Sequence, residues 1–364
     1  MKKVGFIFLA IVLVVALVTG CGKSESPAPA SPSNANSNQA PAVPSSTTQD
    51  LGPPIHFNLG HSLTNEDYRG VGAIYFAEQV EEMSGGNMTI TVFPSETLTT
   101  AQNMVQLVSS GAAEMGAGSL SFAAAVAPDL AGLDIPGTYD PRYFRETYEE
   151  IRDIIDEILE PHGVKLMIMF DETDSVFYLN KSNARQVRTT ADIAGLRIRD
   201  HGLWLGRTIS AWGANPMTVV TSEMSVALER GTVDGGYTGW GFMNVFRLYE
   251  SAPAITFANM SKSAWGPITV NLELWNSLTQ AQRDILTEAA RKTEELTDQM
   301  IADAYVLFLK NVEEAGGTIY QMSAEETAEF IKLAEPVIQQ ARDETGDLGN
   351  KLIDKMQEVR ARYN

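Results

Sequence analysis

The chain has 364 residues, of which 44% are hydrophobic and 20% charged, and its formal net charge at pH 7 is −19. A protein this acidic is poorly suited to bind nucleic acid or an anionic membrane surface directly. It contains one cysteine, so no internal disulfide can form and the apolar core alone must hold the fold. The part of the chain that can fold, about 310 residues, has a length that normally divides into two domains.

Residues 1–20 predict an export signal. Lys2 and Lys3 precede an apolar run over residues 4–18 that is too short for a permanent membrane span. The stretch Val18-Thr19-Gly20-Cys21 resembles the lipobox of bacterial lipoproteins. This resemblance implies that Cys21 is lipidated and anchors an extracytoplasmic protein to a bacterial membrane, at the cell surface or in the periplasm; the alternative is a secreted protein with a free thiol.

Residues 21–54 are rich in Pro, Ser, Ala and Asn and contain no aromatic residue. Such a segment buries too little apolar surface to offset its ordering entropy. We therefore expect a disordered tether that carries no active site.

The body of the chain, from residue 55, alternates strand and helix patterns. In its first half the pattern predicts strands over 55–60, 87–93, 113–118 and 164–170. It predicts helices over 66–83 and 142–159. A third helix is expected to begin at Thr99-x-x-Gln102, which resembles a capping box, and to end near Gly111. In its second half it predicts strands over 175–180, 196–199, 217–220, 254–257 and 268–272, helices over 203–212 and 222–230, and a loop over 233–238. This order is typical of an α/β fold.

Two more helices are predicted near the C-terminus. One begins at the capping box Thr279-x-x-Gln282 and continues to about residue 312; at 1.5 Å per residue it would reach about 50 Å, more than the width of one small domain. The other begins at Ser323-x-x-Glu326. The first helix is therefore expected to lie across both domains.

The sequence offers little for catalysis. Its four histidines, His56, His61, His162 and His201, form no short metal-binding pattern, and nucleophile-elbow, P-loop and dinucleotide-binding motifs are absent from it. Asp171, Glu172 and Asp174 could be metal ligands or paired carboxylates, but such a cluster is more often a solvated loop. We therefore predict a protein that is not an enzyme and needs no cofactor; a secreted enzyme would require a nucleophile or a metal.

Several motifs appear in a fixed order along the body. They are Asn58-Leu-Gly-His61, Phe76-Ala-Glu-Gln-Val-Glu-Glu-Met83, Thr91-Val-Phe-Pro94, Gly111-Ala-Ala-Glu-Met115, Leu133-Asp-Ile-Pro136, Ala191-Asp-Ile-Ala-Gly-Leu-Arg-Ile-Arg199, Gly213-Ala-Asn-Pro216, Ala227-Leu-Glu-Arg-Gly-Thr-Val-Asp-Gly235 and Trp275-Asn-x-Leu278. Together they resemble the solute-binding proteins of TRAP transporters, of the C4-dicarboxylate-binding type.

This resemblance implies a two-lobed α/β fold like that of the type II periplasmic binding proteins, with the long helix bridging the lobes. Lobe I is expected to hold residues 55–174 and 266–305, and lobe II residues 175–265 and 306–364. The implied function is to capture a small organic carboxylate by hinge closure and deliver it to the membrane subunits of a TRAP transporter. An alternative is a sensor lipoprotein that presents the ligand to a membrane receptor.

The resemblance also implies that Arg199 forms a bidentate salt bridge with the ligand carboxylate. A guanidinium presents two parallel N–H groups that match the two oxygens. From the residues alone, internal pairing of Arg199 with Asp200 or with a nearby Glu is equally compatible with the sequence. Arg197 points to the same face of an alternating strand, but the motif favours Arg199.

The chain departs from the family pattern in two places. The stretch 170–178 lacks the second arginine that many members have, and the residues after Val233-Asp-Gly235 include Tyr237, Thr238 and Trp240. We therefore expect a monocarboxylate with an apolar or aromatic body, packed by Tyr237 and Trp240 and hydrogen-bonded by Thr238; the alternative is that both aromatics are core residues. The remaining expected contacts are His61, Ser119, Thr221 and His201.

Overall fold

The structure, a computed structural model, describes residues 51–219 and 223–363, which belong to one compact unit. The export signal, Cys21, most of the predicted tether and Thr221 lie outside the described residues. Within the described part of the chain, no helix has both the length and the apolarity that crossing a membrane requires.

The first sheet has the strand order β2-β1-β3-β10-β4. β1 pairs in parallel with β2 and β3, whereas β10 runs antiparallel to β3 and β4. Its strands are β1 (Ile55–His61), β2 (Met88–Phe93), β3 (Met115–Ala117), β4 (Val164–Phe170) and β10 (Gly266–Asn271).

Helices cover both faces of this sheet. Apolar residues of α1 and α9 share one core with the strands, and those of α2, α3, α4, α10 and α11 form a second core. The helices of these layers are α1 (Tyr68–Met83), α2 (Met104–Ser109), α3 (Leu120–Ala123), α4 (Phe144–Leu159), α8 (Leu272–Ser277), α9 (Gln280–Glu314), α10 (Ala324–Glu344) and α11 (Asp347–Tyr363).

The second sheet has the order β11-β9-β5-β8-β6-β7, with β5 antiparallel to both of its neighbours. One of its faces packs on α6, α7 and the end of α9, and the other on α5 and α10. Its elements are β5 (Asp174–Leu179), β6 (Arg197–Asp200), β7 (Asn215–Thr218), β8 (Gly235–Gly239), β9 (Ala254–Lys262), β11 (Thr318–Gln321), α5 (Leu203–Ala211), α6 (Met224–Glu229) and α7 (Trp240–Val245).

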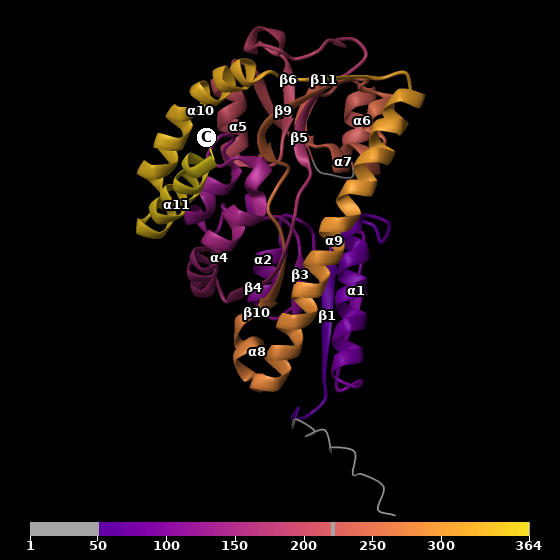
Figure 1. The fold of residues 1–364 in the computed structure, drawn as a ribbon, viewed down its shortest axis with the longest axis vertical. Helices are drawn as coiled ribbons and strands as arrows, with labels where there is room; N and C mark the ends of the chain where they lie inside the picture. Colours follow the sequence, from indigo (N-terminus) through magenta and orange to yellow (C-terminus); the bar gives the residue numbers. More distant parts are fainter. Residues whose placement is uncertain (1–50, 220–222, 364) are drawn as a thin grey trace, which may run out of the picture. The chain divides into compact units, whose positions relative to one another are not determined.

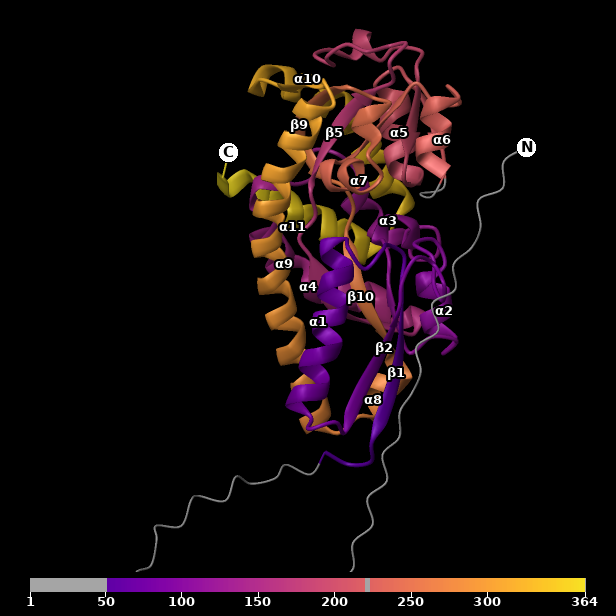
Figure 2. The same cartoon turned by 90° about the vertical axis from the view of Figure 1, so that its right-hand side faces the viewer.

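Three segments connect the two sheets (Figures 1 and 2). Residues 171–173 join β4 to β5, and residues 263–265 join β9 to β10. The third is α9, which packs against α1 beside the first sheet and against α7 beside the second. The prediction of an α/β fold with a long bridging helix is therefore confirmed.

Local sequence signals were reliable where side chains could form caps. The capping boxes of α9, from Thr279 and Gln282, and of α10, from Ser323 and Glu326, are both formed. The predicted capping box at Thr99 was wrong: α2 begins only at Met104, and the Thr99 hydroxyl is buried without a hydrogen-bond partner among the described residues. Helix α11 was not predicted.

The predicted loop over 233–238 was also wrong, because residues 235–239 form β8, a buried strand between β5 and β6. The glycines of this stretch are typical of a turn, but in the structure they allow β8 to pack closely against β5. A Cβ atom on Gly235 would lie 2.1 Å from the carbonyl oxygen of Tyr178, and one on Gly236 would lie 2.2 Å from the Tyr178 hydroxyl. Larger residues could not form this strand without displacing β5.

Residues 51–54, which were predicted to end the tether, contact the folded body. Asn87 donates a hydrogen bond to the Gly52 carbonyl and Gln282 donates one to the Pro53 carbonyl. At the other terminus, α11 packs against α4 rather than on the second sheet. The lobe boundaries stay a prediction, and this packing is a reason to place residues 347–363 with the first sheet.

Candidate functional site

A cavity of about 70 Å³ lies between elements of the two sheets. The first sheet contributes residues that follow β1 and β3, the second contributes residues from β6, β8 and α7, and the connection from β9 to β10 completes the wall. Open α/β sheets commonly bind ligands beyond the carboxyl ends of their strands, where the chain leaves the sheet. The position of the cavity follows that rule.

Arg199 is the central charged group of this cavity. It is the next-to-last residue of strand β6, and only 3% of its surface is exposed. Among the described residues, the Nε atom of Arg199 has no hydrogen-bond partner, and the guanidinium forms no ion pair. The expected alternative, pairing with Asp200, is not found, because that carboxylate accepts hydrogen bonds from the Thr218 hydroxyl and the Gly202 amide instead.

Burial makes this charge unfavourable unless an anion pairs with it. Desolvation lowers the pKa of Arg199, and nearby Tyr178, Asp200 and Asp134 only partly oppose it. The guanidinium carbon lies 5.1 Å from the centre of the Phe242 ring, close enough for a cation–π interaction. A buried guanidinium without a carboxylate partner is a strong binding site for an incoming anion.

Polar groups surround Arg199 in the cavity wall. Ser119, Thr238 and Ser263 bring hydroxyl groups, and the Thr238 and Ser263 hydroxyls lie 3.5 Å apart. His201 Nε2 lies 3.1 Å from the Asp134 carboxylate, and its Nδ1 is buried without a partner among the described residues. The structure thus places Arg199, Ser119, Thr238 and His201, all named from the sequence, around one cavity.

A second arginine also lines the cavity, and sequence reasoning missed it because it comes from α1 rather than from the stretch 170–178. Arg69 donates to both oxygens of Glu172 at 3.0 and 3.1 Å. It also donates to Asp67, from Nε at 2.9 Å and from the other terminal nitrogen at 3.3 Å. The cavity therefore holds two arginines, but one of them is already paired with two carboxylates.

Aromatic and aliphatic side chains form a further part of the wall. They are Leu63, Ala101, Phe122, Phe242 and Ala264. Phe242 was not predicted; it comes two residues after Trp240, and only the fold reveals that α7 turns this ring toward Arg199.

Tyr237 and Trp240 are not among the residues that line the cavity, which corrects the expectation that they pack the ligand. Side chains alternate along β8, so Thr238 faces the cavity while Tyr237 points to the opposite face. There Tyr237 packs against Phe177 and Trp212, and its hydroxyl lies 3.0 Å from that of Ser261. Trp240 stacks on Phe308 of α9. Both are core residues.

His61 lies just behind the cavity wall. It is 2% exposed, and its Nδ1 is within 3.0 Å of both backbone polar groups of Leu63. Burial lowers its pKa. Its neighbours Ser62 and Leu63, rather than His61, line the cavity.

The remaining charged candidates are paired elsewhere. Arg197 binds Asp234 through two nitrogens, and Lys262 lies 3.4 Å from Asp171 and 3.2 Å from Asp174. Among the described residues, no three histidine, cysteine, aspartate or glutamate side chains gather in a way that could hold a metal ion.

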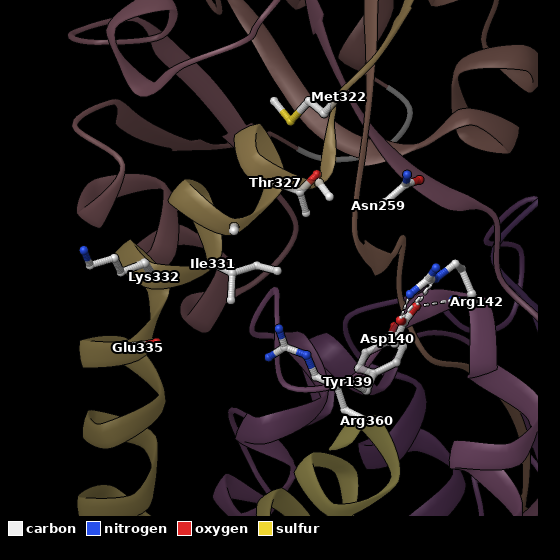
Figure 3. Close-up of a pocket in the computed structure, with 12 residues that line it drawn as sticks. Tyr139, Asp140, Arg142, Asn259, Met322, Thr327, Ile331, Lys332, Glu335 and Arg360 are labelled. Atoms are coloured by element: carbon white, nitrogen blue, oxygen red, sulfur yellow. Dashed lines mark hydrogen bonds and ion pairs between the residues drawn. The ribbon is translucent and has the colours of Figure 1, made fainter. Parts of the chain in front are cut away.

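A larger cavity of about 580 Å³ lies between α10 and the segment that precedes α4 (Figure 3). Its cationic groups are either bonded to neighbouring groups or exposed to solvent, unlike the buried Arg199. Arg142 is turned toward Asp140 and bonded to it, Arg360 donates to the Gly137 carbonyl, and Lys332 on α10 is exposed to solvent. We therefore place the functional site at the smaller cavity around Arg199.

Comparison with known proteins identifies the family of the chain. Residues 59–344 match the model of the family described as bacterial extracellular solute-binding protein, family 7. The chain belongs to this family. It is a solute-binding protein of the TRAP transporter type, which confirms the resemblance seen in the sequence.

Relatives of this family 7 protein differ in the solutes they bind. The C4-dicarboxylate-binding periplasmic protein DctP of Rhodobacter capsulatus is 24% identical over 301 residues, 81% of this chain and 89% of that protein. Two solved structures share the fold. One is a TRAP solute-binding protein of Roseobacter denitrificans with bound β-D-glucuronate, with TM-score 0.77 and 21% identity over 83% of this chain and 99% of the other. The other is the ectoine-binding protein of the TeaABC TRAP transporter of Halomonas elongata, with TM-score 0.78 and 20% identity over 85% and 100%.

Proposed function

We propose that this family 7 protein captures a small organic monocarboxylate in the cavity around Arg199 and releases it unchanged to a TRAP transporter. The observation that carries this proposal is the burial of Arg199 without an anionic partner among the described residues. A ligand carboxylate would take both N–H groups of the guanidinium and supply the missing charge. As the lobes close, removal of water would strengthen this pairing.

The surroundings of Arg199 favour a compact ligand with a single carboxylate. The other arginine at the cavity, Arg69, is paired with Asp67 and Glu172. The cavity volume of about 70 Å³ is far below the roughly 300–1,000 Å³ of sites for drug-sized molecules. Hydroxyl groups of Ser119, Thr238 and Ser263 suit a hydroxyl or keto oxygen of the ligand, and Phe122 and Phe242 suit its carbon body.

Capture would use hinge closure, as in other two-lobed binding proteins. The two strand connections, residues 171–173 and 263–265, and helix α9 would carry the motion. We also propose that Cys21 carries the lipid that tethers the body to the membrane; mass spectrometry of the mature N-terminus tests this, since an unmodified cysteine would contradict it.

The ligand proposal is tested by thermal shift and calorimetry with a library of carboxylates, including lactate and malate as a matched pair of mono- and dicarboxylate. We expect a monocarboxylate to bind, and Arg199→Ala to abolish binding while the protein stays folded. The matched control is Arg197→Ala, on the same strand but paired with Asp234, which should bind as wild type does. Undiminished binding by Arg199→Ala would refute the site.

A further inference from the structure

The cluster formed by Asp67, Arg69 and Glu172 has an unusual charge balance for an anion-binding cavity. Arg69 reaches the cavity wall, yet its Nε and one terminal nitrogen bind Asp67 and its other terminal nitrogen binds Glu172. One guanidinium thus meets two carboxylates. When Glu172 is ionised, the cluster carries a net negative charge, and Arg69, its member in the cavity wall, links it to the cavity that Arg199 also lines.

We propose that Glu172 determines the charge of the ligand, because together with Asp67 it cancels the positive charge that Arg69 brings to the cavity. This inference rests on the proposed function, capture of a carboxylate by Arg199. It assigns to Glu172 a positioning role that acts through Arg69: the first carboxylate of a ligand meets a free arginine, while a second would meet a guanidinium already occupied and a surplus of negative charge.

The position of Glu172 makes it sensitive to a bound anion. Its side chain is buried, with 1% of the residue exposed, and a Cβ atom on Gly266 of β10 would lie 2.2 Å from its Oε1. The groups that face it are Asp67, Tyr68 and Arg69 at the start of α1 and Asp171 beside it in the chain; the Tyr68 hydroxyl lies 3.5 Å from Oε2. The β10 residue that approaches its Oε1 is Gly266, which has no side chain.

Burial raises the pKa of Glu172 to about 7, although Arg69 opposes the shift. An anion bound to Arg199 disfavours the ionised form further, because like charges repel. Ligand binding should therefore be accompanied by proton uptake near neutral pH, and the affinity for a monocarboxylate should fall as pH rises from 6 to 8. The ligand itself, with an ordinary carboxyl pKa, stays ionised throughout this range.

The first test is the variant Glu172→Gln, which keeps the size of the side chain and an acceptor oxygen for Arg69 while removing one negative charge. We expect its affinity for malate, relative to lactate, to rise on the order of tenfold, the effect of one nearby charge at the effective dielectric of a protein. Asp174→Asn is the matched control, since it removes a carboxylate that pairs with Lys262 instead. An unchanged ratio of the two affinities in Glu172→Gln would overturn the proposal.

The second test asks whether Glu172 itself is the source of the pH dependence of binding. We expect the pH dependence of lactate binding between pH 6 and 8 to be lost in Glu172→Gln and kept in Asp174→Asn. If Glu172→Gln keeps the wild-type pH dependence, the titrating group is not Glu172 and the proposal fails.

A third measurement uses the wild-type protein, so it does not depend on how the variants fold. Titration calorimetry at pH 7 in phosphate and in Tris, which differ in ionisation enthalpy, should show a net uptake of protons on lactate binding. Absence of uptake contradicts the inference. If Arg199→Ala abolishes binding but Glu172→Gln changes neither selectivity nor pH dependence, the proposed function stands and only this inference falls.

Discussion

Replacing Arg199 by methionine should stabilise the empty protein while abolishing ligand binding. Methionine is unbranched and adaptable, so it can occupy the space of the arginine stem and pack against Phe242. The charge that it removes is buried and unpaired among the described residues, and desolvation already lowers its pKa. Most substitutions of buried residues lower the free energy of unfolding, but removing an uncompensated buried charge should raise it.

The size of the effect follows from two opposing contributions. Desolvating one ion in a protein costs several kcal/mol after relaxation. The cation–π contact with Phe242 returns about 1–2 kcal/mol of that cost. We therefore expect the free energy of unfolding of the ligand-free protein to rise by about 2 kcal/mol in Arg199→Met, and the melting temperature to rise by a few degrees.

Urea denaturation and thermal melting, each with and without ligand, provide the assay. A saturating ligand at about 100 times its Kd should stabilise the wild type by about 2.7 kcal/mol and the variant not at all. Arg197→Met is the control: its arginine is half exposed and paired, so this variant should be neutral or slightly destabilised and should keep the response to ligand. A ligand-free Arg199→Met protein less stable than wild type would refute the reasoning.

Three further predictions concern other parts of the molecule. Tyr237→Phe should lower the free energy of unfolding by about 1 kcal/mol, because it removes the hydrogen bond to Ser261, and leave ligand affinity unchanged; a large loss of affinity in calorimetry would return Tyr237 to the site. Asn259 is exposed in β9 and has a φ of +51°, a conformation that glycine adopts easily and valine does not. Asn259→Gly should therefore be tolerated, whereas Asn259→Val should lower the free energy of unfolding, measured by urea denaturation, by about 1–2 kcal/mol. Equal stability of the two variants would contradict this prediction. Hydrogen bonding with Arg197 lowers the pKa of Asp234 in the folded protein. The stability that this carboxylate provides is therefore present above its unfolded pKa and is lost as pH falls through its folded pKa. Asp234→Asn should be less stable than wild type in thermal melts at neutral pH, and this difference should vanish in melts at acid pH.

The sequence was informative wherever a local pattern determined the structure. Apolar periodicity and side-chain caps predicted α9 and α10, whose capping boxes form as expected. It failed where distant segments decide the outcome. The glycine-rich stretch 235–239 forms a strand that pairs closely with β5, where a larger residue at 235 or 236 would clash with Tyr178. Nothing within the stretch itself signals that partner.

The aromatic residues after the Val233-Asp-Gly235 motif illustrate the same limit. Their presence was read as a ligand-packing surface, but whether an aromatic ring faces a site depends on strand parity and on what covers each face. Because 235–239 is a strand, Thr238 faces the cavity and Tyr237 the core. Once this strand is known, the placement of Tyr237 follows. Trp240 lies beyond the strand, at the start of α7, and its place in the core depends on Phe308 of the distant helix α9.

Counting arginines near a binding motif cannot give the charge of the ligand. The sequence lacks the second arginine in the stretch 170–178, and the fold supplies another from α1. That guanidinium is charged, but Asp67 and Glu172, which are about 100 residues apart in sequence, already satisfy it. What a ligand encounters is the charge left after internal pairing. On that measure Arg199 is the one arginine of the cavity wall without a carboxylate partner among the described residues. The single carboxylate stays a prediction, and it now rests on this pairing rather than on the arginine missing from 170–178.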